Sequence, residues 1–402
     1  MRKVKLIKRS FYLNQLKSVL GTPDIKIITG IRRSGKSKLL EAFIKEIKKT
    51  DEKANIIHIN YSLLKFEKIM EYHSLAEYVE ENYKPRVHNF VMIDEVQMCP
   101  DFEKAINSLH ASEKYDIYVT SSSAFLLSSD LATLFTGRTF EIKVYPFSFA
   151  EYMTYYGYKN QYEGLQDYMK QGGMAGSYAY NSLEEKYKYI EEDVFNALVV
   201  RDILQKYGIR NTTLLKQLID FLMDNIANIT SGRTIATVLA KNGNKTNDKT
   251  VKKYIEYLCR AFAFYKVRRY DIRGKRYLAF EDKYYVADQA FRYARLGTRN
   301  DDSGRTLENI VAMELLRRGY EVYVGMLYKK EIDFVALKQS EKFYLQVSDD
   351  ISDDKTFSRE VESLLKIKDA YPKILLARTR REQYQYEGIK IIDIADWLLE
   401  NK

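Results

Sequence analysis

The sequence predicts an α/β protein of several domains, in which a parallel sheet covered by helices comes first. The 402 residues are enough for roughly two to four domains of ordinary size, and 46% of them are apolar. Up to about Phe149, apolar segments of strand length alternate with amphipathic segments of helix length. Such alternation is typical of a parallel sheet with helices on both faces. Helical patterns follow, and another α/β segment comes last.

The elements of the first part follow one another in a regular order. The apolar segment from Asp24 to Gly30 predicts a strand that stops at a glycine, and residues 34–49 form an amphipathic helical pattern. Three more apolar runs predict strands at 55–60, 88–96 and 115–123.

Beyond Phe149 the patterns are helical, with long segments at 182–204 and 214–229. Apolar residues then recur at helical spacing, at Val251, Ile255, Leu258 and Phe262. Residues 265–280 predict two short strands around a turn at 273–275. Helices followed by a basic hairpin favour a winged helix. From roughly Lys283, a helical segment and further strands predict a second α/β unit.

Composition excludes several classes of protein. Cys99 and Cys259 lie far apart, and the four histidines show no ligand spacing, so neither a disulfide framework nor a zinc site is expected. No run of 18 apolar residues is present, and the basic N-terminal segment lacks the features of a signal peptide. We expect a cytoplasmic protein that does not enter a membrane.

A phosphate-binding loop is predicted between the first strand and the first long helix. The stretch GIRRSGKS fits G-x-x-x-x-G-K-[ST] at every fixed position. Its glycines allow backbone amides to curl around an anion at a helix N-terminus, where lysine reaches the β and γ phosphates and serine holds Mg²⁺. The two arginine side chains are expected to point outward. The residues expected to bind ATP are Gly30, Ile31, Arg32, Arg33, Ser34, Gly35, Lys36 and Ser37.

Two carboxylates follow about sixty residues later. The apolar strand FVMIDEV brings Asp94 and Glu95 to its C-terminal end, the edge at which open α/β sheets bind ligands. Alone, such a pair is ordinarily two solvated carboxylates at a strand end. Next to a phosphate loop, we expect Asp94 to orient Mg²⁺ and Glu95 to polarise the attacking water as general base.

With these motifs the chain resembles AAA+-type P-loop ATPases, particularly a bacterial and archaeal group with a C-terminal domain of unknown function and nuclease-like fold. The resemblance covers nearly the whole chain. The segments that carry it are ITGIRRSGKS, MIDEVQ, TSSSAFLL, LFTGRTFEIKVYPFSFAEY, GGMAG, RDILQKYGIRN and KYYVADQAFR. The chain departs from the group in two places: Ser121 stands where glycine is usual, and GGMAG lacks the usual Pro and Glu.

The resemblance implies two further site residues. Ser122 would act as sensor 1, with Ser123 as the neighbouring alternative. Arg138 would be an arginine finger, stabilising charge on the transferring phosphoryl group from a neighbouring subunit or within its own; otherwise it is a surface arginine that closes a turn. Action on a neighbouring subunit requires a homo-oligomer.

Positive charge is concentrated in the winged-helix segment. Residues 249–276 contain ten Lys or Arg and two acidic residues, a net charge of +8. Such clustering suits backbone phosphates of DNA, which are bound in a salt-dependent way without reading bases. The alternatives are a solvated helix face, packing between domains and contact with a protein client.

The last segment resembles the PD-(D/E)xK nuclease fold. Glu308 and Asp333 match its helix glutamate and strand aspartate, whereas Gln346 replaces the second acid and Ser348 the lysine. Serine supplies no positive charge beside a scissile phosphate. We therefore expect an inactive shell, unless a lysine elsewhere takes the role; the candidates are Lys329, Lys330 and Lys342.

Four domains are expected, namely an AAA+-type P-loop ATPase domain at 1–158, a helical connector at 159–215, a winged helix at 216–282 and a restriction-endonuclease-like α/β domain at 283–402. The expected function is that of a Mg²⁺- and ATP-dependent ATPase whose nucleotide cycle drives or switches a C-terminal module that binds DNA or protein. The alternatives are a nucleotide-gated DNA-binding regulator with little turnover and, less favoured, an ATP-dependent nuclease.

Overall fold

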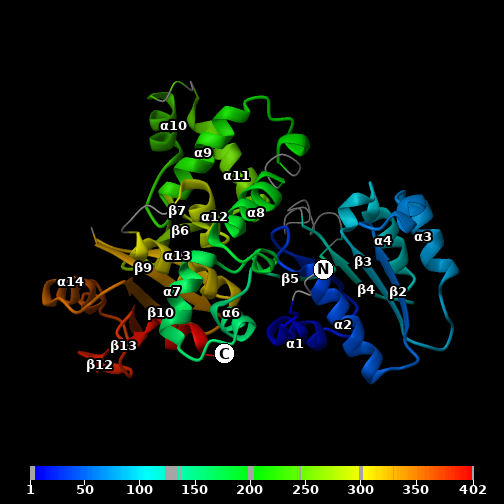
Figure 1. The fold of residues 1–402 in the computed structure, drawn as a ribbon, viewed down its shortest axis with the longest axis horizontal. Coiled ribbons are helices and arrows are strands. Elements are labelled where there is room, and N and C mark those ends of the chain that lie inside the picture. Colours follow the sequence, from blue (N-terminus) through cyan, green and yellow to red (C-terminus); the bar gives the residue numbers. More distant parts are fainter. Residues whose placement is uncertain are drawn as a thin grey trace. The chain divides into compact units, whose positions relative to one another are not determined.

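A computed structural model describes residues 5–122, 135, 137–197, 203–241, 243, 246–297, 302–328 and 330–400, apart from the side chains of 276–280. The chain forms two compact units (Figure 1). The N-terminal unit comprises Leu6–Val144 with Arg260–Phe262, and the C-terminal unit comprises Met1–Lys5, Tyr145–Cys259 and Ala263–Lys402. We describe each unit by itself.

The N-terminal unit is built on a five-stranded parallel sheet with the order β2-β3-β4-β1-β5. Its strands are β1 (Ile25–Thr29), β2 (Asn55–Asn60), β3 (Asn89–Asp94), β4 (Asp116–Thr120) and β5 (Thr139–Lys143). The predicted parallel α/β sheet is thus confirmed. Because β4 lies between β1 and β3, a strand separates the phosphate loop from the strand of Asp94.

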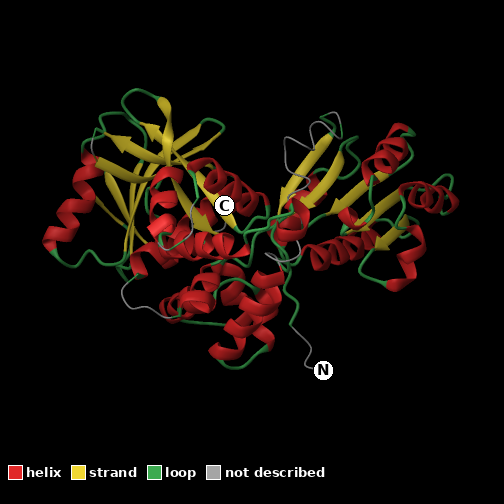
Figure 2. Cartoon of the chain, turned by 90° about the horizontal axis from the view of Figure 1, so that it is seen from above, coloured by secondary structure: helices red, strands yellow, loops and turns green. Residues whose placement is uncertain are grey.

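Helices cover both faces of this sheet, as Figure 2 shows. The helical elements of the unit are α1 (Ser10–Ser18), α2 (Lys36–Thr50), η1 (Leu64–Ile69), α3 (Tyr72–Glu81), η2 (Val96–Met98) and α4 (Phe102–Ala111). Side chains alternate along β1, so Ile28 packs with α1 and α2, whereas Ile25 and Ile27 pack with α3 and α4. Burial on both faces explains why these strands are apolar throughout.

The C-terminal unit begins with helices. They are α6 (Phe149–Tyr156), α7 (Gln161–Gln171), η4 (Ala175–Ala179), α8 (Leu183–Tyr189), the π-helix η5 (Ile190–Asn196), α9 (Thr212–Asp224), α10 (Gly232–Lys241) and α11 (Asp248–Arg260). A hairpin follows, formed by β6 (Phe264–Asp271) and β7 (Arg276–Val286), and Thr230 forms an isolated antiparallel bridge to Asp282 of β7.

The hairpin belongs to an eight-stranded mixed sheet with the order β12-β13-β11-β10-β9-β8-β6-β7. Its other strands are β8 (Glu321–Leu327), β9 (Lys330–Lys338), β10 (Glu341–Ser348), β11 (Lys373–Ala377), β12 (Tyr384–Tyr386) and β13 (Ile389–Asp393). The helices of this part are α12 (Gln289–Leu296), α13 (Ser303–Arg317), α14 (Asp354–Leu365) and α15 (Ile394–Leu399). Near the hairpin tip, β6 pairs in parallel with β8.

This sheet bears on the expected domain limits. Strand β7 runs without a break across the position 282/283 expected to separate two domains, and the hairpin strands are longer than the two short strands expected. The compact units divide at Val144/Tyr145, before the segment PFSFAEY, rather than after it. The physical reason is that hydrogen-bonded strands and packed helices hold these segments to the sheet that follows them.

The two glycines of GGMAG lie where no side chain fits. A Cβ on Gly172 would lie 1.9 Å from Oδ1 of Asp288, and a Cβ on Gly173 would lie 2.2 Å from the carbonyl oxygen of Phe147. The Gly173 N–H donates to Asp288 Oδ2 over 2.5 Å, and the Phe147 N–H donates to the Gly173 carbonyl over 2.8 Å. Three of the quoted segments, PFSFAEY, GGMAG and KYYVADQAFR, therefore meet at one buried point.

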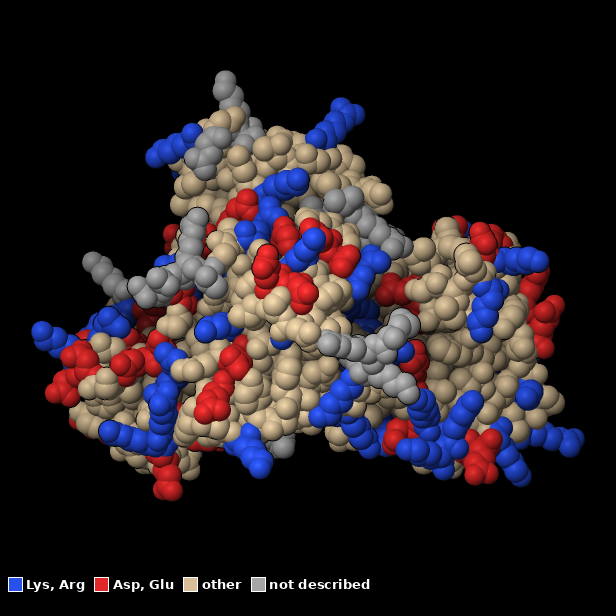
Figure 3. Space-filling model, in the orientation of Figure 1, with Lys and Arg blue, Asp and Glu red and all other residues tan. Residues whose placement is uncertain are grey.

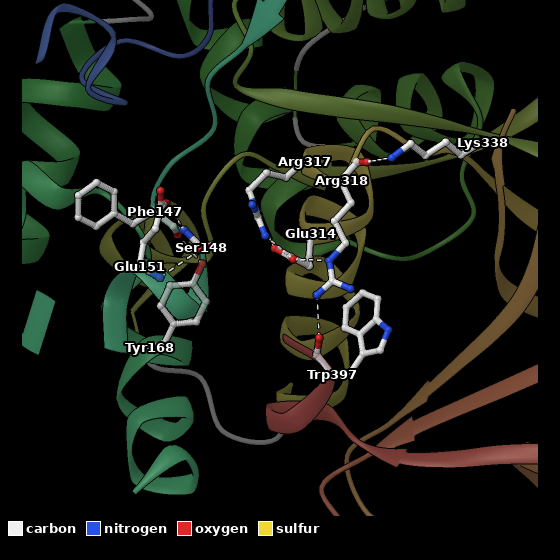
Figure 4. Close-up of polar contacts among 9 residues, drawn as sticks. All are labelled: Phe147, Ser148, Glu151, Tyr168, Glu314, Arg317, Arg318, Lys338 and Trp397. Atoms are coloured by element: carbon white, nitrogen blue, oxygen red, sulfur yellow. Dashed lines mark hydrogen bonds and ion pairs between the residues drawn. The ribbon is translucent and has the colours of Figure 1, made fainter. Parts of the chain in front are cut away.

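Beside this point, Figure 4 shows the two arginines that end α13 turned toward Glu314. The Arg318 guanidinium also donates to the carbonyl oxygen of Trp397 over 2.7 Å and lies 4.3 Å from the indole ring. Lys338 of β9 donates to the Arg318 carbonyl over 3.0 Å. Polar contacts thus join α13 to α15 and to the mixed sheet.

Candidate nucleotide site

The phosphate loop has a backbone that glycine makes possible. Gly30, Arg33 and Gly35 have φ values of 138°, 64° and 96°, and α2 begins directly afterwards at Lys36. A Cβ on Gly30 would lie 2.1 Å from the carbonyl oxygen of Val144. Only glycine fits this position, because the backbone after β5 passes too close for a side chain.

Lys36 is folded back over its own loop. Its side chain is buried, and Nζ donates to the carbonyl oxygens of Gly30 and Ile31 over 2.8 and 3.0 Å. Arg9, also buried, donates to the Ser34 carbonyl over 2.9 Å. The buried Ser34 hydroxyl has no hydrogen-bond partner among the described residues. A helix N-terminus, a buried ammonium and an unsatisfied hydroxyl together fit a phosphate group.

Asp94 and Glu95 follow at the same edge of the sheet. Asp94 ends β3 and is buried, and its Oδ1 accepts a hydrogen bond from the Thr120 hydroxyl at the end of β4. The Glu95 N–H donates to the Thr120 Oγ1 over 3.0 Å. Parallel strands carry all of these groups to one edge, since the carboxyl ends of β1, β3 and β4 lie together.

The Glu95 carboxylate is already engaged. Its Oε2 accepts hydrogen bonds from the Ser122 hydroxyl, over 2.7 Å, and from the Gln97 side-chain amide. The structure thus brings the expected sensor residue Ser122 to the expected base, whereas Ser123 lies outside the described residues. Sequence reasoning missed Gln97 and Thr120; the signal for Gln97 was its place two residues after Glu95 in MIDEVQ.

Arg138 lies at the other end of the sheet. It is exposed, and its carbonyl accepts from the Ile25 N–H, over 2.9 Å, where β1 begins. The phosphate loop starts where β1 ends, about 16 Å away for five residues of strand. The structure therefore does not bring Arg138 to the phosphate loop of its own subunit.

In the C-terminal unit, the structure brings together two of the expected nuclease positions and one residue that was not expected. Lys283 of β7 is buried, and its Nζ lies 2.7 Å from Glu308 Oε1 and 3.9 Å from Asp333 Oδ1. Burial alone lowers the pKa of Lys283, but the carboxylates around it outweigh burial and raise that pKa above its usual value. Burial and the nearby Glu308 raise the pKa of Asp333.

The lysines expected to migrate toward these carboxylates pair elsewhere. Lys330 pairs with Glu362 over 2.5 Å, and Lys342 lies among the rings of Tyr270, Tyr344 and Tyr371. Lys329 lies outside the described residues.

The basic segment is partly neutralised within the fold. Arg269 pairs with Glu281, Lys266 with Asp282 and Lys252 with Asp248. The side chains that are exposed in this segment include three lysines of α11 and three residues near the hairpin turn, namely Lys249, Lys252, Lys253, Arg268, Arg273 and Lys275.

Comparisons with known proteins agree with the nucleotide site. An AAA domain matches residues 22–153, and a domain of unknown function, DUF8612, matches residues 162–302. An uncharacterized protein of Haemophilus influenzae is 37% identical over 402 residues, which cover 98% of this chain and 99% of the relative. An uncharacterized protein of Methanocaldococcus jannaschii is 26% identical over 411 residues, covering 98% and 89%.

Two solved structures are similar at low scores. The Aeropyrum pernix ORC1 protein in complex with DNA has a TM-score of 0.33 and 12% identity, covering 73% of this chain and 93% of that one. AMPPCP-bound DnaA from Aquifex aeolicus has a TM-score of 0.30 and 16% identity, covering 52% and 66%. Similarity at this level says nothing about function.

Within the described ranges, no helix combines the length and apolar character of a membrane span. The phosphate loop and the carboxylates of β3 both lie inside the matched AAA domain. Through its full-length similarity to the Haemophilus influenzae protein, the chain belongs to the same family as that relative, and residues 22–153 match an AAA domain.

Proposed function

We propose that this protein is an ATPase whose nucleotide cycle drives or switches the C-terminal unit. The observation that carries the proposal is the meeting of the phosphate loop, Asp94, Glu95 and Ser122 at the carboxyl edge of one parallel sheet. A loop of this geometry binds phosphate, and carboxylates at the same edge supply the groups that hydrolysis needs.

The residues present fit Mg²⁺ and ATP. The amides of residues 30–37 and the Lys36 ammonium would hold the β and γ phosphates once Lys36 releases the two carbonyl oxygens that it now contacts. Ser37 and Asp94 would hold the metal, which neutralises charge on the phosphates when bound. Glu95 would accept a proton from the attacking water.

Glu95 needs a change of partners for that role. The Glu95 Oε2 accepts hydrogen bonds from Ser122 and Gln97, so both donors would have to turn away before this oxygen could accept a hydrogen bond from the attacking water. Ser122 would turn toward the γ-phosphate as the sensor and so release Glu95. Nucleotide binding and activation of the base would then be coupled through one hydroxyl.

The position of Arg138 favours action on a neighbouring subunit. Its backbone lies at the amino end of β1, about 16 Å from the loop that follows this strand, which is farther than an arginine side chain reaches. As an arginine finger, Arg138 would therefore complete the site of another copy of the chain. The active form would be a homo-oligomer.

The C-terminal unit supports a winged-helix proposal. Helices α9, α10 and α11 precede the hairpin, and Thr230 pairs with Asp282 of the hairpin in an isolated antiparallel bridge. The hairpin tip is not a free wing, because residues 268–271 pair with β8. Contact with DNA phosphates would fall to the exposed lysines of α11 and to the exposed Arg268, Arg273 and Lys275 near the hairpin turn, with a protein client as the alternative partner.

The hydrogen bonds that Glu95 accepts from Ser122 and Gln97 favour a second candidate function. If the carboxylate stays bound to Ser122 and Gln97 after ATP binds, hydrolysis is slow and the protein acts as a nucleotide-gated DNA-binding regulator. This function predicts tight ATP binding, little turnover and a DNA affinity that differs between the ATP and ADP states.

Steady-state ATP hydrolysis with Mg²⁺, with and without single-stranded and duplex DNA, tests the proposal. Lys36→Ala should abolish nucleotide binding and serves as the blank, whereas Glu95→Gln should bind ATP without hydrolysing it. Lys38→Ala, which removes an exposed lysine of the same helix paired with Glu41, is the matched control. Turnover in Glu95→Gln equal to wild type would contradict the assignment of the base.

A wild-type rate no higher than that of Lys36→Ala, together with tight ATP binding, would favour the regulator. Stimulation by DNA would link the phosphate loop to the C-terminal unit, and indifference to DNA would point to a protein client.

A further inference from the structure

A single buried ammonium lies among three carboxylates in the C-terminal unit. The Lys283 side chain is 2% exposed, and its Nζ lies 2.7 Å from Glu308, 2.5 Å from Glu331 and 3.9 Å from Asp333. The Tyr285 hydroxyl donates to the same Glu308 oxygen over 2.6 Å. Within the part of the chain that the structure describes, Lys283 is the cation that pairs with all three carboxylates.

The three carboxylates come from elements that the backbone does not pair with β7. Glu308 lies on α13, and Glu331 and Asp333 lie on β9, which two other strands separate from β7 in the sheet. The side chain of Lys283 therefore makes a connection that main-chain hydrogen bonds do not make. It ties the end of the hairpin to the helix and to the centre of the mixed sheet.

The other two nuclease positions are also satisfied inside the protein. Gln346 accepts from the Asp333 N–H over 3.2 Å and donates to Glu360 over 3.0 Å. The Ser348 hydroxyl donates to the Asp350 carbonyl over 3.0 Å. The described residues contain no group of His, Cys, Asp or Glu arranged to hold a metal ion.

We propose that the Lys283 ammonium is a built-in counter-ion that takes the place of a divalent metal among Glu308, Glu331 and Asp333. This nuclease-like centre would then have a structural role, holding β7, α13 and β9 together. Asp333 is buried, whereas the side chains of Glu308 and Glu331 are 13% and 34% exposed. Carboxylates this close together need a nearby positive charge, which a metal supplies in an active nuclease. Here the cation is covalently part of β7. The proposal does not depend on the activity of the AAA domain.

The test is thermal unfolding of the full-length protein with and without millimolar Mn²⁺, comparing wild type with Lys283→Met. Removing the ammonium leaves the buried Asp333 and the largely covered Glu308 without a counter-charge, so we expect Lys283→Met to lower the melting temperature of the C-terminal unit by about 10 °C. Mn²⁺ should restore part of this loss in the variant and should leave wild type unchanged.

Lys266→Met is the matched control. Lys266 is on the neighbouring strand of the same hairpin and pairs with Asp282 over 2.8 Å, but its side chain is 43% exposed. We expect Lys266→Met to change the melting temperature by no more than about 2 °C and to show no response to Mn²⁺.

Two further measurements keep the proposal open to refutation if Lys283→Met does not fold. The double variant Lys283→Met with Glu308→Gln removes one charge of each sign and should be more stable than Lys283→Met alone. Titration of wild type with Mn²⁺ needs no variant. Saturable binding of Mn²⁺ to wild type that Asp333→Asn abolishes would overturn the proposal, as would Mn²⁺- or Mg²⁺-dependent DNA cleavage by wild type that Asp333→Ala abolishes.

Discussion

Asp288 is a buried carboxylate at the point where three segments of the C-terminal unit meet. It is the N-cap of α12, and its carboxylate accepts hydrogen bonds from the N–H groups of Ala290 and Gly173, over 2.9 and 2.5 Å. Burial raises the pKa of Asp288 to about 7, and the two N–H donors oppose this effect. A charge that forms near neutral pH therefore lies where three sequence segments meet.

The raised pKa of Asp288 predicts that the free energy of unfolding depends on pH. The folded pKa lies above the unfolded value of 3.8, so folding favours the protonated form. This contribution to the free energy of unfolding is fully present below about pH 4 and is lost as pH rises through about 7, by up to roughly 4 kcal/mol. Chemical denaturation of wild type and Asp288→Asn at several pH values measures it.

Asp288→Asn should remove the fall in stability between pH 4 and 7. The control is Asp353→Asn at the exposed N-cap of α14, whose stability should still fall between pH 4 and 7 because Asp288 is intact. Parallel profiles for Asp288→Asn and wild type would show that another group titrates.

Gly173 gives a second prediction for single residues. A Cβ there would lie 2.2 Å from the Phe147 carbonyl oxygen and 2.8 Å from the Phe147 nitrogen, both of which belong to the backbone and have little room to move. We expect Gly173→Ala to lower the free energy of unfolding by about 2 kcal/mol or more. Gly304→Ala, a helical position with open space around it, should be neutral or slightly stabilising by the same denaturation measurement.

At the level of elements, the basic segment 249–276 covers nearly all of α11, then β6 and the turn of the β6–β7 hairpin, and the helix and the hairpin are packed differently. The hairpin tip is held by β8, whereas α11 buries Val251, Ile255 and Leu258 and leaves its lysines exposed. A helix with one apolar face and exposed cations is available to phosphates. A contact with DNA at this segment would therefore involve less positive charge than its net +8 suggests.

Replacing Lys249, Lys252 and Lys253 together by alanine should weaken DNA binding and reduce the slope of log K against log salt by roughly 2 to 3. Fluorescence anisotropy with duplex DNA at several salt concentrations measures both quantities. Figure 3 shows that positive and negative side chains are interspersed over the face of the molecule in view. The matched control replaces three exposed lysines of α2, namely Lys45, Lys48 and Lys49. An equal loss in both triple variants would show that α11 is not a specific DNA contact.

At the scale of the whole molecule, the site in one copy of the chain is incomplete if Arg138 is the finger. The phosphate loop and the carboxylates lie at one end of β1, and Arg138 lies at the other. A second copy could bring its Arg138 to the first copy's phosphates, which a single copy cannot do for itself.

Mixing two inactive variants tests this arrangement. Arg138→Ala and Glu95→Gln each lack one group of the proposed site, so each alone should hydrolyse ATP at least about 100-fold more slowly than wild type. If Arg138 acts on a neighbouring subunit, a mixture should recover part of the activity, because some interfaces then combine a wild-type Arg138 with a wild-type Glu95. No recovery, in mixtures that sedimentation shows to be mixed oligomers, would argue against this role.

The sequence alone determined the parallel sheet and the nucleotide loop, because both depend on local order: an apolar strand, a glycine-rich turn and an amphipathic helix in direct succession. The carboxylates Asp94 and Glu95 were predictable for the same reason, since they follow a strand whose end must lie at the same edge. Contacts between residues far apart in the chain followed no local rule. Only the tertiary structure could place Lys283 beside Glu308, Gly173 against Asp288, and Arg138 at the edge opposite the loop.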